Sequence, residues 1–198
     1  MLEFKNVSVR LSADLVSMPF SLEMDGGVVA CLSGDAGSGK SQLLLAILGL
    51  APLESGYITL DGELVTRESS AYFRNMIAYV PQRMPSDHVK VQELFEDLLG
   101  LRVAAPVSAS LSALPKRWEA MGLPADLLDQ WTDQVAAPLL RTAMLAAVPL
   151  LRRPIVLLDD PAPQAVESGL VGGLASSGVE VLYATRPDDL PGHKIVKI

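Results

Sequence analysis

The sequence is poor in cysteine, in aromatic residues and in basic residues, and each shortage excludes a class of protein. Cys31 is its one cysteine among 198 residues, so a disulfide framework within the chain is impossible. Aromatic residues make up 5% while hydrophobic residues make up 49%, so the core must be aliphatic. The formal net charge is -7, which argues against a nucleic-acid partner, because affinity for a phosphate backbone comes mainly from lysine and arginine.

The sequence also lacks a long uncharged apolar run. A helix that crosses a membrane needs about 20 such residues, and no stretch reaches that length. Glu3, Lys5 and Arg10 interrupt any apolar run near the N-terminus that could act as a signal peptide. We therefore expect a cytoplasmic protein. If it works at a membrane, it must dock onto a separate membrane subunit.

A phosphate-binding loop is the strongest motif in the chain. It matches the pattern G-x-x-x-x-G-K-[ST] and consists of Gly34, Asp35, Ala36, Gly37, Ser38, Gly39, Lys40 and Ser41. Residues 28–33 before it read as a buried strand, and residues 42–50 after it read as a helix that is apolar nearly all round. This context favours phosphate binding, since loop amides and a helix N-terminus then face the same anion.

Apolar periodicity predicts further elements on both sides of this loop. Residues 2–10 and 21–24 read as strands of an antiparallel edge, and Asp61-Gly62 reads as a hairpin turn. Residues 76–80 form another short strand, and residues 91–101 an amphipathic helix.

The second half of the chain begins with residues 103–115, which lack a period and read as a loop. Two short helices are expected at 115–121 and 125–134, followed by a longer one at about 137–151 that Pro149 bends or shortens. The remaining strands are expected at 155–158 and 179–184, and residues 194–198 alternate again.

Strands that alternate with helices predict a mostly parallel sheet, with ligands at the carboxyl ends of its strands. Asp159 follows one such strand, as the phosphate loop follows another. We therefore expect Asp159 to hold Mg²⁺ beside the phosphates. The alternative is that Asp159 and Asp160 only cap the turn that follows.

Taken together, these motifs resemble the nucleotide-binding domain of ATP-binding-cassette (ABC) proteins over nearly the whole chain. Besides the phosphate loop, three segments carry the resemblance: Glu54-Ser55-Gly56 with Leu60-Asp61-Gly62, Ile77-Ala78-Tyr79-Val80-Pro81-Gln82, and Leu150-Leu151-Arg152-Arg153-Pro154-Ile155-Val156-Leu157-Leu158-Asp159. The resemblance implies an α/β P-loop NTPase fold with a mostly parallel sheet core, an antiparallel β edge and a helical subdomain. One domain would fill residues 1–198, with its core at about 1–82 and 141–198 and the helical subdomain at about 83–140.

The resemblance also assigns site residues. Residues 34–41 would bind ATP, and Ser41, Gln82 and Asp159 would hold Mg²⁺, with Gln82 sensing the metal and the γ-phosphate. The catalytic pair would be Gln82 and Asp160. Gln82 could instead be an ordinary surface glutamine.

Several positions depart from the family pattern. Leu11 stands where an aromatic residue stacks on adenine, and nothing at about 136–140 resembles the LSGGQ-like signature. Asp160 replaces the glutamate that polarises water, and Arg186 replaces the switch histidine. The dimer-contacting loop is replaced by residues 162–165. The triphosphate grip is therefore retained while the composite hydrolytic site is altered, which predicts slow or partner-dependent hydrolysis.

The resemblance implies an ATP-binding subunit of an ABC-type transporter, working as a homodimer against an integral membrane permease at the inner face of the membrane. One alternative is a regulatory module that switches by ATP occupancy without turnover. Another is a P-loop small-molecule kinase, which the scattered Arg83, Arg102 and Arg117 disfavour, because such a kinase usually has an arginine-rich lid.

Overall fold

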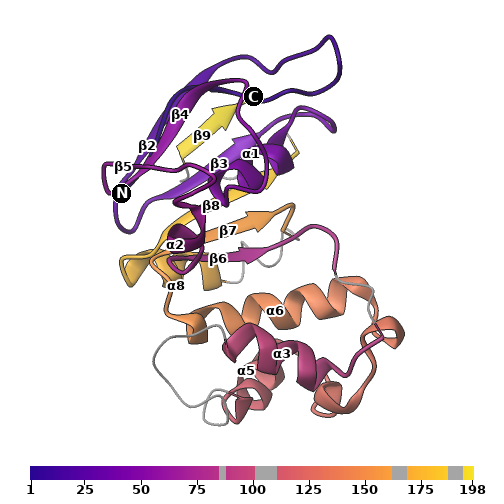
Figure 1. Ribbon diagram of the computed structural model, residues 1–198. Helices are drawn as coiled ribbons and strands as arrows, with labels where there is room; N and C mark the ends of the chain where they lie inside the picture. The colour runs from indigo at the N-terminus through magenta and orange to yellow at the C-terminus, as the bar shows by residue number, and fades with distance from the viewer. Residues whose placement is uncertain (85–87, 101–110, 162–168, 187–193) are drawn as a thin grey trace. The chain divides into compact units, whose positions relative to one another are not determined.

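The structure is a computed structural model that describes residues 1–84, 88–100, 111–161, 169–186 and 194–198. These residues form two compact units, one of Met1–Tyr79 with Arg153–Ile198 and one of Val80–Arg152. Figure 1 colours the chain by residue number, from indigo at the N-terminus to yellow at the C-terminus. Residues 162–165, which replace the family's dimer-contacting loop, and most of the expected loop at 103–115 lie outside the described residues.

The first unit contains an antiparallel sheet of four strands. Its strands, in the order β2-β1-β4-β5, are β2 (Phe20–Met24), β1 (Leu2–Ser8), β4 (Ser55–Leu60) and β5 (Glu63–Leu64). The turn between β4 and β5 places Asp61 at φ 52° and Gly62 at φ 81°, which is the hairpin geometry that an Asp-Gly pair favours. The predicted hairpin is therefore confirmed, and the antiparallel strands form a sheet of their own.

A second sheet of five strands carries the ends at which a ligand is expected. Its strands, in the order β6-β7-β8-β3-β9, are β6 (Ile77–Val80), β7 (Ile155–Asp159), β8 (Glu180–Thr185), β3 (Val29–Ser33) and β9 (Lys194–Lys197). The pairs β7–β8, β8–β3 and β3–β9 are all parallel. Residues of β7 are buried throughout, as expected for a central strand covered on both faces.

One aliphatic core joins both sheets to helix α1 (Lys40–Ile47). Leu2 and Phe4 from the antiparallel sheet, Leu43 and Ile47 from α1, and Leu157 from the parallel sheet all belong to it and are at most 1% exposed. This packing fixes the N-terminus of α1 relative to the strand ends. Two short helices that the sequence analysis missed complete the unit, α2 (Ser70–Arg74) and α8 (Leu170–Ser176).

The second unit is helical. It contains α3 (Val91–Gly100), α5 (Leu114–Ala120), α6 (Ala137–Leu151) and the 3-10 helices η1 (Leu127–Asp129) and η2 (Thr132–Gln134). Trp118 is fully buried, lies edge-on to Phe95 with 5.2 Å between ring centroids, and donates its Nε1–H to the Ala143 carbonyl oxygen at 3.2 Å. Helix α6 continues past Pro149 to Leu151, so the proline does not end it earlier.

The helix expected at 125–134 is wrong. Two 3-10 turns stand there, separated by extended backbone at Gln130 and Trp131. Trp131 forms an antiparallel bridge with Lys90, and the Val91 amide donates to the Gln130 carbonyl oxygen. This pairing uses backbone groups that a continuous helix would keep for itself, so a long-range contact overrides the local helical preference.

Candidate functional site

The phosphate loop leaves β3 and enters α1, as its sequence predicts. The Gly34 amide donates to the Thr185 carbonyl oxygen at 3.3 Å, which ties the start of the loop to the end of β8. Gly37 and Gly39 adopt φ of 85° and 97°, a left-handed conformation that side chains disfavour. A Cβ on Gly39 would also lie 2.6 Å from Val9 Cγ2 and 2.7 Å from Leu11 Cδ2. The loop curl therefore requires glycine at position 39.

Helix α1 presents its N-terminus to this loop without a side-chain cap. Gly39 is its N-cap residue, and no side chain among the described residues hydrogen-bonds to that cap. The first turn of a helix carries amides with no intrahelical partner and about half a unit of positive charge. The end of α1 is therefore suited to an anion.

The Lys40 ammonium lies folded into its own loop. Its Nζ donates to the carbonyl oxygens of Gly34 and Asp35 at 2.7 Å each and to Ser38 Oγ at 3.2 Å. Burial lowers the pKa of Lys40 from its ordinary value, and the carboxylates of Asp160, Asp159 and Asp35 offset part of this lowering. The three donors of the ammonium can thus be transferred from two carbonyl oxygens and one hydroxyl to phosphate oxygens.

Ser41 and Asp159 meet across the sequence. Ser41 Oγ donates to Asp159 Oδ1 at 3.0 Å, joining the first turn of α1 to the last residue of β7. Asp159 is 6% exposed, so its carboxylate is withdrawn from bulk water. The structure therefore brings together two residues that the sequence analysis chose as Mg²⁺ ligands.

Asp160 and Arg186 lie at the carboxyl ends of β7 and β8. The Asp160 backbone has φ 51°, and its amide donates to the Ala184 carbonyl oxygen at 2.8 Å. Both side chains act electrostatically on Lys40, with Asp160 raising its pKa and Arg186 lowering it. Both residues therefore share the electrostatic environment of the phosphate loop.

Gln82 is exposed and belongs to the helical unit, Val80–Arg152. Asp159 belongs to the other unit, so the contact expected between Gln82 and the metal stays a prediction.

Leu11 borders a small cavity beside α1. The cavity has a volume of about 330 Å³ and is lined by Arg10, Leu11, Ser12, Gln42, Ala51 and Pro52. The Arg10 guanidinium pairs with Glu54 and donates to the Ala13 carbonyl oxygen at 3.0 Å. The cavity has no aromatic lining residue, so the structure supplies no ring for a base to stack on at this place.

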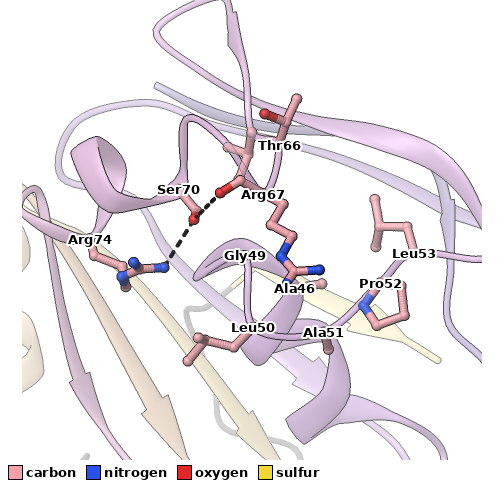
Figure 2. A pocket seen from close by; sticks show the side chains of 11 residues that line it. Ala46, Gly49, Leu50, Ala51, Pro52, Leu53, Thr66, Arg67, Ser70 and Arg74 are labelled. Carbon is pink, nitrogen blue, oxygen red and sulfur yellow. Dashed lines mark hydrogen bonds between the residues drawn. The ribbon is translucent and has the colours of Figure 1, made fainter.

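A larger open cavity lies at the other end of α1. It has a volume of about 790 Å³ and is lined by Ala46, Gly49, Leu50, Ala51, Pro52, Leu53, Val65, Thr66, Arg67, Ser70 and Arg74. Arg74 donates to Ser70 Oγ and to the Leu48 carbonyl oxygen at 3.0 Å each, while Arg67 extends toward Ala46 (Figure 2). Its described lining residues are thus a mixture of apolar side chains, the hydroxyls of Thr66 and Ser70 and two guanidinium groups, without a carboxylate. The sequence analysis missed this cavity, because its walls come from separate segments.

The sequence analysis also missed Tyr79. Its hydroxyl lies 3.5 Å from Asp159 Oδ2, on the oxygen that Ser41 does not contact. Burial and the adjacent Asp159 carboxylate raise the pKa of Tyr79 to about 12, so the phenol remains a neutral donor. The sequence holds no local signal for this contact, because it depends on the adjacency of β6 and β7 in the sheet.

The donor set fits a magnesium ion shared with phosphates. No cluster of three or more His, Cys, Asp or Glu side chains poised for a metal occurs among the residues that the structure describes. Magnesium in nucleotide sites usually takes one or two protein oxygens and completes its shell with phosphate oxygens and water. Ser41 and Asp159 match that limited requirement.

Comparison with known proteins identifies a family and several relatives. The sequence profile described as ABC transporter matches residues 18–163. The zinc import ATP-binding protein ZnuC of Jannaschia sp. (strain CCS1) is 30% identical over 163 residues, which are 82% of this chain and 60% of that protein. The ergothioneine transport ATP-binding protein EgtV of Helicobacter pylori (strain G27) is 28% identical over 79% of this chain and 73% of that protein. The chain thus spans less than two thirds of the zinc import relative.

Solved structures share the fold. A putative ABC transporter ATP-binding protein from Pyrococcus furiosus superposes with a TM-score of 0.77 at 19% identity, covering 99% of this chain and 96% of that one. An ATP-binding cassette solved as a dimer with ADP and phosphate gives a TM-score of 0.76 at 20% identity, covering 93% and 88%. The predicted P-loop NTPase fold, with a parallel and an antiparallel sheet, is confirmed. By its sequence profile and by its fold, the chain belongs to the ABC transporter family.

Proposed function

We propose that the chain is the ATP-binding subunit of an ABC-type transporter and that it binds MgATP at the phosphate loop. The observation that carries this proposal is the 3.0 Å hydrogen bond from Ser41 to Asp159 beside the uncapped N-terminus of α1. It puts a hydroxyl and a carboxylate together where backbone amides already favour an anion. The names of the relatives, which include a zinc import and an ergothioneine transport ATP-binding protein, support the transport assignment.

Residues 34–41 would hold the triphosphate, and each has a physical reason. The glycines let the backbone curl around phosphate oxygens, and Lys40 neutralises their charge after leaving the carbonyl oxygens of Gly34 and Asp35. Ser41, Asp159 and Gln82 would hold Mg²⁺, whose role is to neutralise charge that develops on the phosphates.

Hydrolysis would be slow in the isolated chain. We assign Asp160 and Gln82 as the catalytic pair, in which Asp160 would orient the attacking water. Its side chain is one methylene shorter than the glutamate of the family, and a displacement of about 1 Å can cost roughly a hundredfold in rate. Asp160 also starts from a left-handed backbone with φ 51°. The carboxylate is therefore constrained both in reach and in direction.

The N-terminus of α6 offers a second reason for slow turnover. This is where the family signature, which cradles the γ-phosphate of the opposite subunit, would stand. Ala136 is the N-cap, with no side-chain cap hydrogen bond among the described residues, and a proline occupies the first turn. A proline has no amide hydrogen and alanine has no hydroxyl, so this end has fewer donors for a phosphate. A homodimer would bring two such ends to its two sites, whereas a partner with an intact signature could supply the missing donors.

The open cavity at the end of α1 is our candidate for contact with the permease, in addition to the helical region of about 83–140. Its mixed lining of apolar side chains and two arginines suits a segment that combines apolar side chains with a carboxylate. Leu50, which is 62% exposed, borders it. None of the helices among the described residues has the length and apolarity to span a membrane.

Site-specific cross-linking tests this contact. Cys31 is the one cysteine and is buried, so Leu50→Cys introduces the reactive thiol at the cavity. In native membranes we expect a cross-link to a polytopic membrane protein. Leu64→Cys, at a residue 50% exposed on β5, is the control and is expected to give none. Equal cross-linking at both positions would contradict the assignment.

A regulatory module that senses ATP without turnover is the second candidate. The altered Asp160 and the donor-poor end of α6 favour it over an active ATPase. It would show ATP affinity with no phosphate release, alone or with a partner, whereas a transporter subunit would gain turnover when its permease is present.

Calorimetric titration with ATP, ADP and GTP, with and without Mg²⁺, tests the proposed function. Lys40→Ala removes the ammonium, and we expect roughly a ten- to hundredfold loss of ATP affinity, since hydrogen bonds to charged groups contribute about 1.5–3 kcal/mol. Lys116→Ala, at an exposed residue of α5, is the matched control. Unchanged affinity in Lys40→Ala would refute the proposal.

A further inference from the structure

We propose that Tyr79 is a positioning residue for Asp159, and that it holds the carboxylate in the orientation in which it serves the magnesium ion. The inference rests on the proposed function, because it concerns the same MgATP site. It adds a residue on β6 to a site otherwise built from the phosphate loop and the end of β7.

The two oxygens of Asp159 have donors from two different elements. Oδ1 accepts from Ser41 on α1 at 3.0 Å, and Oδ2 accepts from the Tyr79 hydroxyl on β6 at 3.5 Å. Strands β6 and β7 are neighbours in the parallel sheet, so both phenol and carboxylate stand on a rigid frame. A carboxylate held at both oxygens cannot rotate about its χ2 angle without losing one of these contacts.

Burial makes the second donor valuable. Asp159 is 6% exposed, and a buried carboxylate oxygen that loses its hydrogen-bond donor carries a desolvation cost. The Ser41 hydroxyl is itself an assigned metal ligand, and it can donate its hydrogen to Asp159 while its oxygen lone pairs face the metal, so Ser41 has two tasks. Tyr79 is not an assigned ligand, so its contact serves the carboxylate alone. Partners of this kind orient metal-binding groups and tune their affinity.

Packing is the competing explanation for Tyr79. The residue is half-buried, and its ring packs against the aliphatic core of the first unit. If Tyr79 serves only in packing, its ring is sufficient and its hydroxyl has no function. A positioning role depends on the hydroxyl, so Tyr79→Phe separates the two, since it keeps the ring and removes one oxygen atom.

The test is the ratio of ATP affinities with Mg²⁺ and with EDTA, measured by titration calorimetry on the whole chain. We expect Tyr79→Phe to reduce this ratio about tenfold, the lower end of the effect seen when a partner of a metal ligand is removed. The affinity in EDTA should stay unchanged, and the loss of one hydrogen bond should lower the melting temperature by no more than about 2–4 °C. Tyr57→Phe, at a residue 48% exposed on β4, is the matched control and should leave the ratio intact.

Every outcome is informative. An unchanged ratio in Tyr79→Phe would overturn the inference, and so would equal losses with Mg²⁺ and with EDTA, which would indicate packing. If wild type binds no ATP at all, the proposed function itself fails and the inference with it. A normal wild type with an unaffected Tyr79→Phe variant would reject the inference alone. Tyr79→Met, which removes the ring as well as the hydroxyl, is the packing control. We expect it to lose more stability than Tyr79→Phe while its ratio of affinities with Mg²⁺ and with EDTA matches that of Tyr79→Phe.

Discussion

Ser41 Oγ and Asp159 Oδ1 lie 3.0 Å apart although 118 positions separate them in the sequence. The contact joins the helix that follows the phosphate loop to the end of β7, which β8 separates from β3 in the parallel sheet. It exists because parallel strands end at one edge of their sheet, where the loops that follow them converge. The residues around this contact that can be tested are Asp160, Leu11, Gly39 and Lys40.

Replacing Asp160 with glutamate should accelerate ATP hydrolysis. The added methylene carries the carboxylate about 1 Å further, and recovery of that distance corresponds to roughly a ten- to hundredfold increase in rate. Phosphate release under saturating MgATP is the measurement, and Asp14→Glu, in an exposed loop, is the control. A variant that remains inactive, even with its permease, would favour the regulatory module instead.

Replacing Leu11 with tyrosine should strengthen ATP binding. The cavity that Leu11 borders has no aromatic lining residue, and base–aromatic stacking contributes about 1–3 kcal/mol per base. Affinities for ATP and for inorganic tripolyphosphate, which has no base, separate stacking from other effects. An equal gain for both ligands would show that the new ring does not contact the base.

Alanine at position 39 should destabilise the fold. The substitution meets a left-handed backbone at φ 97° and a close approach to Val9 and Leu11, for which we expect a loss of about 1–3 kcal/mol. Gly62→Ala is matched, since its φ is 81° and nothing lies within 4 Å of its added Cβ. Urea denaturation of both variants measures the difference, and equal losses would mean that the contact with Val9 and Leu11 is harmless.

ATP affinity should fall at alkaline pH earlier than an ordinary lysine would allow. Burial lowers the pKa of Lys40 below its usual value of 10.5, so the ammonium loses its proton as the pH rises through that lowered pKa. A neutral amine no longer offsets phosphate charge. Calorimetry between pH 7 and 10 measures the decline, and Lys40→Arg, which stays charged, should flatten it. Parallel profiles for wild type and Lys40→Arg would contradict this account.

Much of the fold could be predicted from hydrophobic periodicity and turn chemistry. The hairpin at Asp61-Gly62 and the amphipathic helix α3 follow from patterns within a few residues, which tertiary contacts reinforce. The segment 125–134 could not be predicted in this way, because its backbone pairs with Lys90 and Val91 at a distance in sequence. Helix α8 contains two successive glycines, Gly172 and Gly173, which weaken any helical pattern.

The site residues also divide into those that a local sequence pattern identifies and those that only the fold brings together. Residues 34–41 could be identified from the spacing of their glycines, lysine and serine, and Asp159 from its place at the end of an apolar run. Tyr79 could not be assigned from sequence, because the register that brings its hydroxyl to Asp159 is a property of two strands. The open cavity at Arg67 and Arg74 likewise needs the fold, since α1 and α2 meet there at Gly49. Whether Gln82 reaches the metal stays a prediction.

Strand β9 is an edge strand of the parallel sheet as described. The residue after it, Ile198, packs closely against Gly34 at the start of the phosphate loop. The Ile198 amide donates to the Ser33 carbonyl oxygen at 3.0 Å, and a Cβ on Gly34 would clash with the Ile198 carbonyl oxygen. Outer strands detach more readily than inner ones, because they are paired on one side only. Detachment of β9 would remove the contacts that Ile198 makes with Ser33 and Gly34, while the hydrophobic core stayed folded. On warming, the affinity for ATP should therefore fall at temperatures below the melting temperature of the protein.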